Sequence, residues 1–288
     1  DKEGGHGVVD MYKSIVESCD TYYYTLARDM GVDMIYEQMK PLGFGQITGI
    51  DILGESRGVL PSTEWKRTTY KKAEQQRWYS GETISLGIGQ GYNSFTMLQI
   101  AHATATIANN GLKMRPHIVR EVLDVETKAP TPVAKEPIGQ LPLSPENLDI
   151  IKRAMIGVNI EGTSASSFVG AQYVSAGKTG TAQVYTVKQN EKYNAATVDE
   201  RMRDHALFIA FAPADEPKVA LAMVVENSGF GAQNAAPIAR RVFDFVILGQ
   251  YPSEEDIAAV QKGQATRPIG KPRDLASVPW PPKNITTT

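Results

Sequence analysis

The stretch Ala176-Gly177-Lys178-Thr179-Gly180-Thr181-Ala182-Gln183-Val184 decides how the rest of the chain is interpreted. It lies in the run 174–185, which we expect to form a strand. Phosphate-binding loops also contain Gly-Lys-Thr, but they need another glycine five positions earlier, where this chain has Gln172. Because the flanking residues place Lys178 on a strand and not at a helix start, we disfavour a phosphate loop.

Lysine, threonine and glycine on a strand are suited to one side of an acyl-transfer site. Lys178 offers a cation and a proton near a nucleophile, and the hydroxyls of Thr179 and Thr181 can hold a substrate carboxylate. Gly180 leaves room for a peptide-like ligand, and a backbone amide just beyond it can help to form an oxyanion hole. For these residues taken alone, a lysine that simply faces solvent from an edge strand is the alternative.

The chain after this stretch has the pattern of a hairpin and a closing helix. Two apolar runs flank the proline-containing segment 213–217, which has too many residues for a two-residue turn. The runs and the helix are expected at residues 206–212, 219–226 and 235–248, with apolar Ile238, Val242, Phe245 and Val246 in the helix. From Tyr251 on, Pro, Lys and Thr accumulate, so we expect a domain over residues 1–248 and a weakly ordered tail over residues 249–288.

The region before the stretch is mostly helical by its apolar spacing. We expect helices at residues 8–30, 33–43, 96–109 and 144–158, the first interrupted at residues 18–20 and stopped by Gly31. Loops are expected over residues 44–85, with a solvated basic segment from Lys66 to Lys72, and over residues 128–143, whereas residues 117–125 predict an edge strand. Helices followed by strands and a closing helix indicate an α+β fold with helices packed on an antiparallel sheet.

Ser18-Cys19-Asp20 is the second candidate for chemistry. A Ser-x-Asp pattern usually only caps a helix, and either Ser18 or Asp20 could do so here. In an acyl-transfer site, the hydroxyl of Ser18 would relay a proton and Asp20 would orient a lysine or the substrate amide. A third cluster, Gly87–Gly91, lacks the third glycine of a dinucleotide fingerprint, because Ser94 stands there. We expect that cluster to be a tight loop before a helix.

Composition disfavours several other classes of protein. The net charge is −2 and is spread along the chain, which gives no support for nucleic-acid binding. A serine hydrolase that relies on a catalytic histidine is disfavoured, because His102 and His205 are expected to be packed or structural. No apolar run approaches the ~20 residues that span a bilayer. The loop-like first residues lead us to expect that the chain begins inside a larger protein.

Together these segments resemble the class B penicillin-binding proteins, and among them the members that act in rod-shape elongation in Gram-negative bacteria. The resemblance covers about residues 5–248. It rests on the Lys-Thr-Gly stretch and on the segments Gly5-His6-Gly7, Ser18–Tyr24, Ile88–Gly91 and Arg203–Pro213. It implies the fold shared by penicillin-binding proteins and serine β-lactamases, with a helical subdomain and an antiparallel sheet flanked by helices, incomplete at its N-terminus.

The resemblance implies a D,D-transpeptidase that cross-links peptidoglycan stem peptides and is a target of β-lactams. A serine attacks the penultimate D-alanine carbonyl, D-alanine leaves, and an amine from a neighbouring strand resolves the acyl-enzyme. In this pattern Ser18 and Asp20 match the family's Ser-x-Asn motif. Lys178-Thr179-Gly180 matches its strand motif, and the amide of Thr181 supplies an oxyanion donor. The chemistry itself requires no cofactor.

The resemblance also implies partners and a location. The partners would be an elongation glycosyltransferase and a periplasmic scaffold protein, besides the stem peptides and β-lactams, with no nucleic acid. The location would be the periplasmic face of the bacterial inner membrane, anchored by a segment absent from this chain.

Two departures from the family's pattern affect the expected chemistry. The family's Ser-x-x-Lys motif, which holds the nucleophile and its base, is expected upstream of this chain, so we expect the chain alone to be inactive. Its one Ser-x-x-Lys, Ser175 to Lys178, overlaps the strand motif and is interpreted as a decoy. Asp20 stands in place of asparagine, and because an ionised carboxylate only accepts hydrogen bonds, its partner must be a donor.

His6 and Cys19 are residue types that bind zinc, but a closed site needs two further ligands. Asp1 is the only aspartate that precedes His6 in this chain. Some elongation-type members look zinc-bound at the positions of His6 and Cys19, together with two upstream aspartates. The resemblance therefore implies a structural zinc that would fix the loop of Ser18 through Cys19.

Two other functions stay open at this point. One is a serine β-lactamase, against which Asp20 and the elongation-type flanking segments argue. The other is a non-catalytic penicillin sensor or a scaffold for elongation partners.

Overall fold

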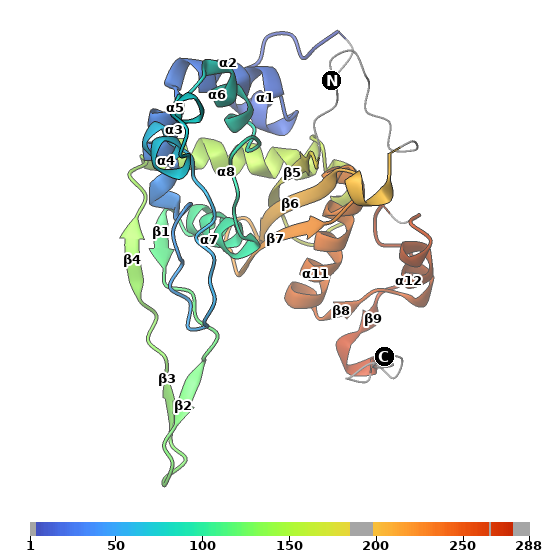
Figure 1. Cartoon of the computed structure of the whole chain (residues 1–288). Coiled ribbons are helices and arrows are strands. Elements are labelled where there is room, and N and C mark those ends of the chain that lie inside the picture. Colours follow the sequence, from blue (N-terminus) through green and yellow to red (C-terminus); the bar gives the residue numbers. More distant parts are fainter. Residues whose placement is uncertain (1–3, 185–197, 265, 279–288) are drawn as a thin grey trace. The chain divides into compact units, whose positions relative to one another are not determined.

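The computed structural model describes residues 4–184, 198–264 and 266–278. The chain, coloured along its sequence in Figure 1, divides into two compact units. Unit 1 contains residues 1–14 and 18–152, and unit 2 contains residues 15–17 and 153–288. Helix α8 (Pro145–Ile160) contributes its first half to unit 1 and its second half to unit 2. Within the described ranges, no helix is long and apolar enough to cross a membrane.

Unit 1 is largely helical, as its sequence predicts. Its helices are α1 (Met11–Val16, whose last two residues belong to unit 2), α2 (Asp20–Met30), α3 (Val32–Met39), η1 (Lys40–Leu42), α4 (Thr63–Thr69), α5 (Ala73–Gln76), α6 (Ser80–Leu86) and α7 (Met97–Ala108). Gly31 ends α2 with a φ of 74°, a conformation that glycine adopts without strain. Thr96 and Gln99 form a capping box at the start of α7. The polar and glycine residues therefore set the boundaries of these helices.

Residues 44–85 contain three helices, so the expectation of long loops there was wrong. Ser62 begins α4 by accepting a hydrogen bond from the amide of Trp65 at 2.9 Å. Glu82 begins α6 by accepting a hydrogen bond from the amide of Tyr79 at 2.9 Å. These helices are at most seven residues long, which is too short for an apolar period to stand out in the sequence.

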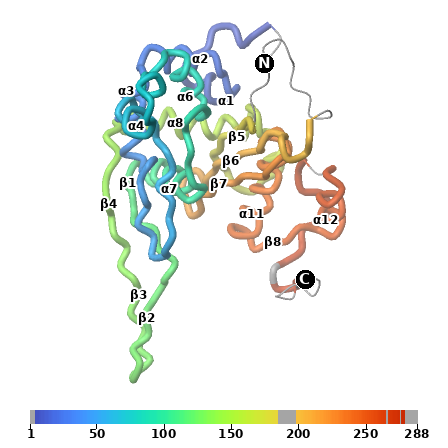
Figure 2. Tube along the Cα trace, viewed as in Figure 1, coloured from blue at the N-terminus to red at the C-terminus, as the bar shows by residue number. Residues whose placement is uncertain are grey.

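Unit 1 also contains two short antiparallel strand pairs. β1 (Leu112–Met114) pairs with β4 (Pro137–Gln140), and β2 (Glu121–Leu123) pairs with β3 (Pro130–Pro132). In Figures 1 and 2, β2 and β3 form an arm that extends beyond β1 and β4. The edge strand expected in residues 117–125 is β2. The connection expected over residues 128–143 contains β3 and β4 instead, because proline is tolerated at an edge where no donor is needed.

Unit 2 contains a three-stranded antiparallel sheet. Its strands are β5 (Ala176–Ala182), β6 (His205–Ala212) and β7 (Val219–Val225), in the order β5-β6-β7, and η2 (Glu200–Met202) precedes β6. Lys178 lies opposite Ile209, and Phe208 lies opposite Met223. The three predicted strands are thus confirmed. Tyr185, at the end of the first predicted strand, lies outside the described residues.

Helix α11 (Ala236–Leu248) covers one face of this sheet (Figure 1), and α9 (Ala165–Phe168) and α10 (Gly231–Asn234) pack against α11. The buried core between them consists of Phe168, Ala206, Phe208, Ala210, Ala212, Ala235, Ala236, Ala239 and Phe243. Small alanines on β6 and α11 allow the helix to approach the sheet closely. The apolar residues noted in the sequence of this helix, such as Val242, are partly exposed, whereas Arg240 and Asp244 are buried and paired at 2.9 Å.

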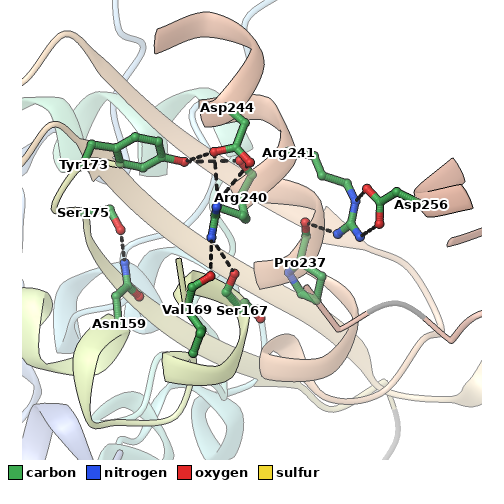
Figure 3. Close-up of polar contacts among 10 residues, drawn as sticks. All are labelled: Asn159, Ser167, Val169, Tyr173, Ser175, Pro237, Arg240, Arg241, Asp244 and Asp256. Atoms are coloured by element: carbon green, nitrogen blue, oxygen red, sulfur yellow. Dashed lines mark hydrogen bonds and ion pairs between the residues drawn. The ribbon is translucent and has the colours of Figure 1, made fainter. Parts of the chain in front are cut away.

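The segment after residue 248 differs from the expected weakly ordered tail. β8 (Gln250–Tyr251) pairs with β9 (Arg273–Asp274), α12 (Glu254–Gln261) lies between them in sequence, and η3 (Leu275–Ser277) follows. Asp256 is fully buried and accepts two hydrogen bonds from Arg241 of α11, at 2.6 and 2.8 Å (Figure 3). Such a bidentate pair fixes α12 on α11. The expectation of weak order was therefore wrong for residues 250–264 and 266–278, and the domain boundary at residue 248 stays a prediction.

Candidate active site

Lys178-Thr179-Gly180 lies on β5, at one edge of the described three-stranded sheet. Successive side chains alternate between the faces of a strand, so Lys178 lies on one face and Thr179 on the other. Nζ of Lys178 donates to the backbone carbonyl of Thr179 at 2.9 Å, and residues 178–181 are all half-buried. This environment differs from that of a lysine that simply faces solvent from an edge strand.

A buried polar network fixes the start of β5 to the end of α8. Nδ2 of Asn159 donates to Oγ of Ser175 at 2.9 Å (Figure 3), and Oγ of Ser164 donates to Oδ1 of Asn159 at 2.6 Å. The hydroxyl oxygens of Thr163 and Thr179 are 2.7 Å apart. Because these groups satisfy one another, the network holds the strand in one position. The network could not be recognised in the sequence, because its partners are 16 positions apart and form no known motif.

Ser175 does not have the environment of a nucleophile. It precedes β5 directly, is 4% exposed, and its hydroxyl accepts the hydrogen bond from Asn159. A nucleophilic serine must reach both a base and the substrate. The structure therefore supports the interpretation of Ser175-x-x-Lys178 as a decoy.

Two glycines allow the backbone to pack closely around β5. A Cβ atom on Gly177 would lie 2.5 Å from Cζ of Phe208. A Cβ atom on Gly231, at the start of α10, would lie 2.4 Å from the carbonyl oxygen of Gly180. Neither position has room for a side chain, because protein interiors are close-packed. Glycine at both positions is therefore needed for the motif strand to keep its contacts with β6 and α10.

Ser18 lies in the turn between α1 and α2. Its φ of 54° is in the left-handed region, which costs a residue other than glycine ~1–2 kcal/mol. Cys19 is the N-cap residue of α2, its amide donates to the carbonyl of Ser14 at 2.9 Å, and its side chain is buried. Asp20 is the first helical residue and is exposed, so the expectation that Ser18 or Asp20 caps this helix was wrong. A strained turn beside an exposed carboxylate is consistent with a functional role.

Helix α6 packs closely against α2 and supports this turn. A Cβ atom on Gly87 would lie 2.5 Å from the carbonyl oxygen of Tyr23. The hydroxyl of Tyr23 lies 3.1 Å from Oγ of Ser14, and burial raises the pKa of Tyr23 although this hydrogen bond opposes the rise. Gly89 and Gly91 both have positive φ. The prediction that Gly87–Gly91 is a tight loop before a helix is confirmed.

Lys66 was expected in a solvated segment, but it is 3% exposed. Its ammonium pairs with Glu82 and lies 5.3–5.4 Å from the ring centroids of Trp78, Tyr79 and Tyr92. Burial opposes both charges and is the largest single influence, but the hydrogen bond and charge attraction between the two groups, together with the contact to Tyr92, outweigh it. The pKa of Lys66 is therefore raised and that of Glu82 is lowered. This cluster ties α4, α6 and the segment before α7 together. It supports unit 1 and was missed because the aromatic residues are scattered in the sequence.

The structure agrees with the expected roles of two histidines. Nε2 of His102 lies 2.7 Å from the carbonyl oxygen of Met114, and burial lowers the pKa of this imidazole. Nδ1 of His205 accepts a hydrogen bond from the amide of Asn227 at 2.9 Å. Both side chains therefore have structural partners.

The residues of the candidate site belong to different units. Ser18 and Asp20 lie in unit 1, and Lys178 lies in unit 2, so their convergence on one site stays a prediction. His6 and Cys19 both lie in unit 1. In the part of the chain that the structure describes, no three His, Cys, Asp or Glu residues are grouped to hold a metal ion, and Asp1 lies outside that part. The described residues therefore do not complete a zinc site.

Comparisons with known proteins agree with this architecture. A model of the penicillin-binding protein transpeptidase domain matches residues 1–244. The peptidoglycan D,D-transpeptidase MrdA of Haemophilus influenzae is 41% identical over 263 residues, covering 88% of this chain and 39% of that protein. The crystal structure of Pseudomonas aeruginosa PBP2 in complex with WCK 5153 has a TM-score of 0.69 and 38% identity, covering 83% of this chain and 49% of that one. Helicobacter pylori PBP2 in complex with MreC has a TM-score of 0.68 and 28% identity, and the match covers 85% of this chain and 41% of that one.

The chain therefore belongs to the penicillin-binding protein transpeptidase family. Within that family it is similar to the MrdA and PBP2 proteins, which confirms the resemblance to elongation-type members. The predicted α+β fold, with helices and an antiparallel sheet, is also confirmed. The chain spans about two fifths of the length of the curated relatives it matches.

Proposed function

We propose that this chain is part of a peptidoglycan D,D-transpeptidase, which cross-links stem peptides during cell elongation and is a target of β-lactams. The observation that carries the proposal is β5, where Lys178-Thr179-Gly180 lies on an edge strand held by Asn159 and Thr163. Membership of the transpeptidase family and the similarity to MrdA support the same activity.

The proposed reaction proceeds through an ester on a serine that lies outside this chain. The serine oxygen attacks the carbonyl carbon of the penultimate D-alanine, the bond to the terminal D-alanine breaks, and that D-alanine leaves with the proton on its amine. The amine of a second stem peptide then attacks the ester, which forms the cross-link and returns a proton to the serine. With water as the acceptor, the same ester would give D,D-carboxypeptidase activity.

The residues of this chain would bind the substrate and manage protons and charge. The ammonium of Lys178 would stabilise negative charge near the serine, and the hydroxyl of Thr179 can donate to a substrate carboxylate while accepting from Thr163. The amide of Thr181 would donate to the oxyanion, where such donors have their largest effect. Ser18 would relay a proton, and Asp20 would accept a hydrogen bond from a cationic donor.

Labelling with a fluorescent penicillin tests this role of Lys178. In the full-length protein, Lys178→Ala should slow acylation on the order of 100-fold, as the loss of one preorganised electrostatic group does in acyl-transfer enzymes. Lys218→Ala is the matched control, because Lys218 is an exposed lysine directly before β7, on the edge of the sheet opposite β5, and it should label at the wild-type rate. Equal labelling of both variants would exclude Lys178 from the site.

Two further assays separate the competing functions. Rapid turnover of nitrocefin by the full-length protein would favour a serine β-lactamase. Acylation by penicillin without cross-linking of a lipid-linked substrate would favour a sensor or scaffold. We expect slow nitrocefin turnover together with cross-linking.

Two similar structures support the proposed partners. One similar structure is a complex of PBP2 with MreC from Helicobacter pylori, and another is a peptidoglycan synthase complex that coordinates polymerisation and cross-linking. We expect the full-length protein to bind a periplasmic scaffold and an elongation glycosyltransferase at the periplasmic face of the inner membrane. Co-purification from solubilised membranes tests both contacts, and recovery of the protein only in the cytoplasmic fraction would contradict the location.

A structural zinc is a separate proposal. His6 and the buried Cys19 would supply two ligands, the remainder coming from residues outside the described part of the chain. When bound, the metal would fix the loop that carries Ser18. Elemental analysis of the full-length protein should find one zinc in the wild type and less in Cys19→Ser, and equal contents would remove Cys19 as a ligand.

A further inference from the structure

The β2–β3 arm, residues 118–133, exposes an unusual concentration of apolar side chains. Its first strand and the residues beside it are well exposed: Ile118 64%, Val119 43%, Val122 60%, Leu123 54% and Val125 82%. Isolated exposed apolar residues are ordinary on a protein surface, but a contiguous group of them indicates an interaction site. The backbone N–H and C=O groups of the arm indicate that this site binds another strand.

The two strands of the arm have different outer edges. The amide of Val133 donates to the carbonyl of Arg120 at 2.9 Å, and the amide of Asp124 donates to the carbonyl of Ala129 at 3.0 Å. In the alternating antiparallel pattern, Glu121 and Leu123 then point their backbone N–H and C=O groups away from β3. Among the described strands, β2 pairs with β3 alone, so this outer edge of β2 is open.

The outer edge of β3 is closed by proline. Pro130 and Pro132 lie opposite Leu123 and Glu121, at the positions whose backbone groups point outward. Proline has no N–H group, so this edge cannot donate to another strand there. A further strand can therefore be added to the arm at β2 and not at β3.

We propose that β2 pairs with β2 of a second copy of this chain, antiparallel and centred on Val122. In this register Glu121 lies opposite the partner's Leu123, and the outward groups of both residues form four backbone hydrogen bonds across the two-fold axis. The result is a four-stranded sheet in the order β3-β2-β2-β3. Its two outer edges are the proline-containing strands, so the sheet stops at a dimer.

The charges on β2 fit a second copy in the same register. Arg120, Val122 and Asp124 share one face of the strand, because side chains alternate. Centring on Val122 places Arg120 opposite the partner's Asp124 on both sides of the axis, and Val122 opposite the partner's Val122. Cross-strand pairs of opposite charge stabilise antiparallel sheets. An arbitrary strand would not carry this complementary order of charge.

The groups that form this pair are available on the surface of the chain. Hydrogen bonds from Thr127 and Glu126 hold the pKa of Asp124 below its ordinary value, so its carboxylate is charged at neutral pH. These bonds all end on Oδ1 of Asp124. Arg120 contacts Glu121 at 2.9 Å, but its side chain is 86% exposed, and such surface pairs rearrange readily.

Cysteine cross-linking of the full-length protein tests the register. Val122→Cys places two thiols at a non-hydrogen-bonded antiparallel position, where Cα atoms are about 4.5 Å apart and a disulfide can form. Mild oxidation should give a covalent dimer at least ~10-fold faster than for Thr131→Cys, since disulfide formation requires this proximity. Thr131 lies directly opposite Val122 and is also exposed, but it is on the closed strand. Wild-type protein controls for Cys19, which is buried.

A second variant separates strand pairing from chance collision. Leu123→Pro removes one outward N–H group of β2 and leaves the bonds to β3 intact. Combined with Val122→Cys, it should lower the cross-linking rate to that of Thr131→Cys. Equal rates for Val122→Cys and Thr131→Cys, or a rate that Leu123→Pro leaves unchanged, would overturn the proposal.

Discussion

Two antiparallel sheets of this molecule have opposite environments. In unit 2, Phe208 and Ala210 of β6 are 1% and 0% exposed, because α11 covers that face. In unit 1, Val122 and Leu123 of β2 are 60% and 54% exposed. Both strands have residues typical of strands, so propensity alone does not decide burial. What differs is whether another element packs on the strand. A covered sheet gives stability, and an open one gives a surface for a partner.

The largest expected difference between the two sheets is in the cost of losing a side chain. Phe208→Ala should lower the free energy of unfolding by ~3–5 kcal/mol, because it leaves a cavity between β6 and α11. Val122→Ala, the matched change in the arm, should alter it by no more than ~0.5 kcal/mol, as surface substitutions do. Urea denaturation of both variants measures the difference. Similar losses for both would show that the arm is packed in solution.

The same contrast between buried and exposed positions applies to charge. Lys66→Met should lower the free energy of unfolding by ~3 kcal/mol, since it leaves the half-buried carboxylate of Glu82 without its buried cation. The adjacent Arg67 also pairs with a glutamate, but both side chains are more than 60% exposed, and Arg67→Met should cost ~0.5 kcal/mol or less. Thermal unfolding of the two variants at equal pH tests this. An equal shift in Tm would mean that the Lys66 pair is solvated.

A smaller effect is expected where the covered sheet has no spare room. Gly177→Ala should lower the free energy of unfolding by ~1–3 kcal/mol, because its Cβ would displace the packed ring of Phe208. Gly81→Ala in α6 is the control, since nothing lies within 4 Å of its Cβ position and the residue is helical. That change should raise stability by ~0.5–1 kcal/mol. Urea denaturation of both variants should therefore give shifts of opposite sign, and shifts of the same sign would contradict the packing.

The smallest expected effect is a local response of the arm to acid. Asp51 accepts hydrogen bonds from the amides of Ile118 and Val119, and Asp124 accepts one from the amide of Thr127. These bonds lower the pKa of both carboxyls below 3.8. The hydrogen bonds to the two ionised carboxylates therefore contribute fully to stability above pH 3.8. This contribution is lost as the pH falls through the lowered pKa values of Asp51 and Asp124.

Amide NMR signals recorded from pH 5 downward check this response. The signals of Ile118, Val119 and Thr127 should shift at a lower pH than an unperturbed aspartate titrates. The amides of β6 should keep their signals through the same range. Simultaneous loss of both sets would indicate general acid unfolding and contradict a local response of the arm.

The sequence determined the main elements and the residues of both motifs. Lys178-Thr179-Gly180 lies on the strand that its flanking residues predicted, and the chain breaks at Ser18-Cys19 between two helices as expected. These features depend on local properties, namely glycine positions, capping side chains and apolar runs, which one sequence carries. Family membership could likewise be inferred from short motifs.

Only the tertiary structure decided which charged and polar side chains are buried. Lys66 lies in a basic run, yet rings far away in the sequence surround it, and Asp256 lies in a polar segment that Arg241 holds on α11. Asn159 fixes β5 through Ser175, with no recognisable motif. Burial of a polar group depends on partners that the fold brings together, because an unpaired one is too costly to bury. That condition involves residues far apart in the sequence, so no local pattern contains it.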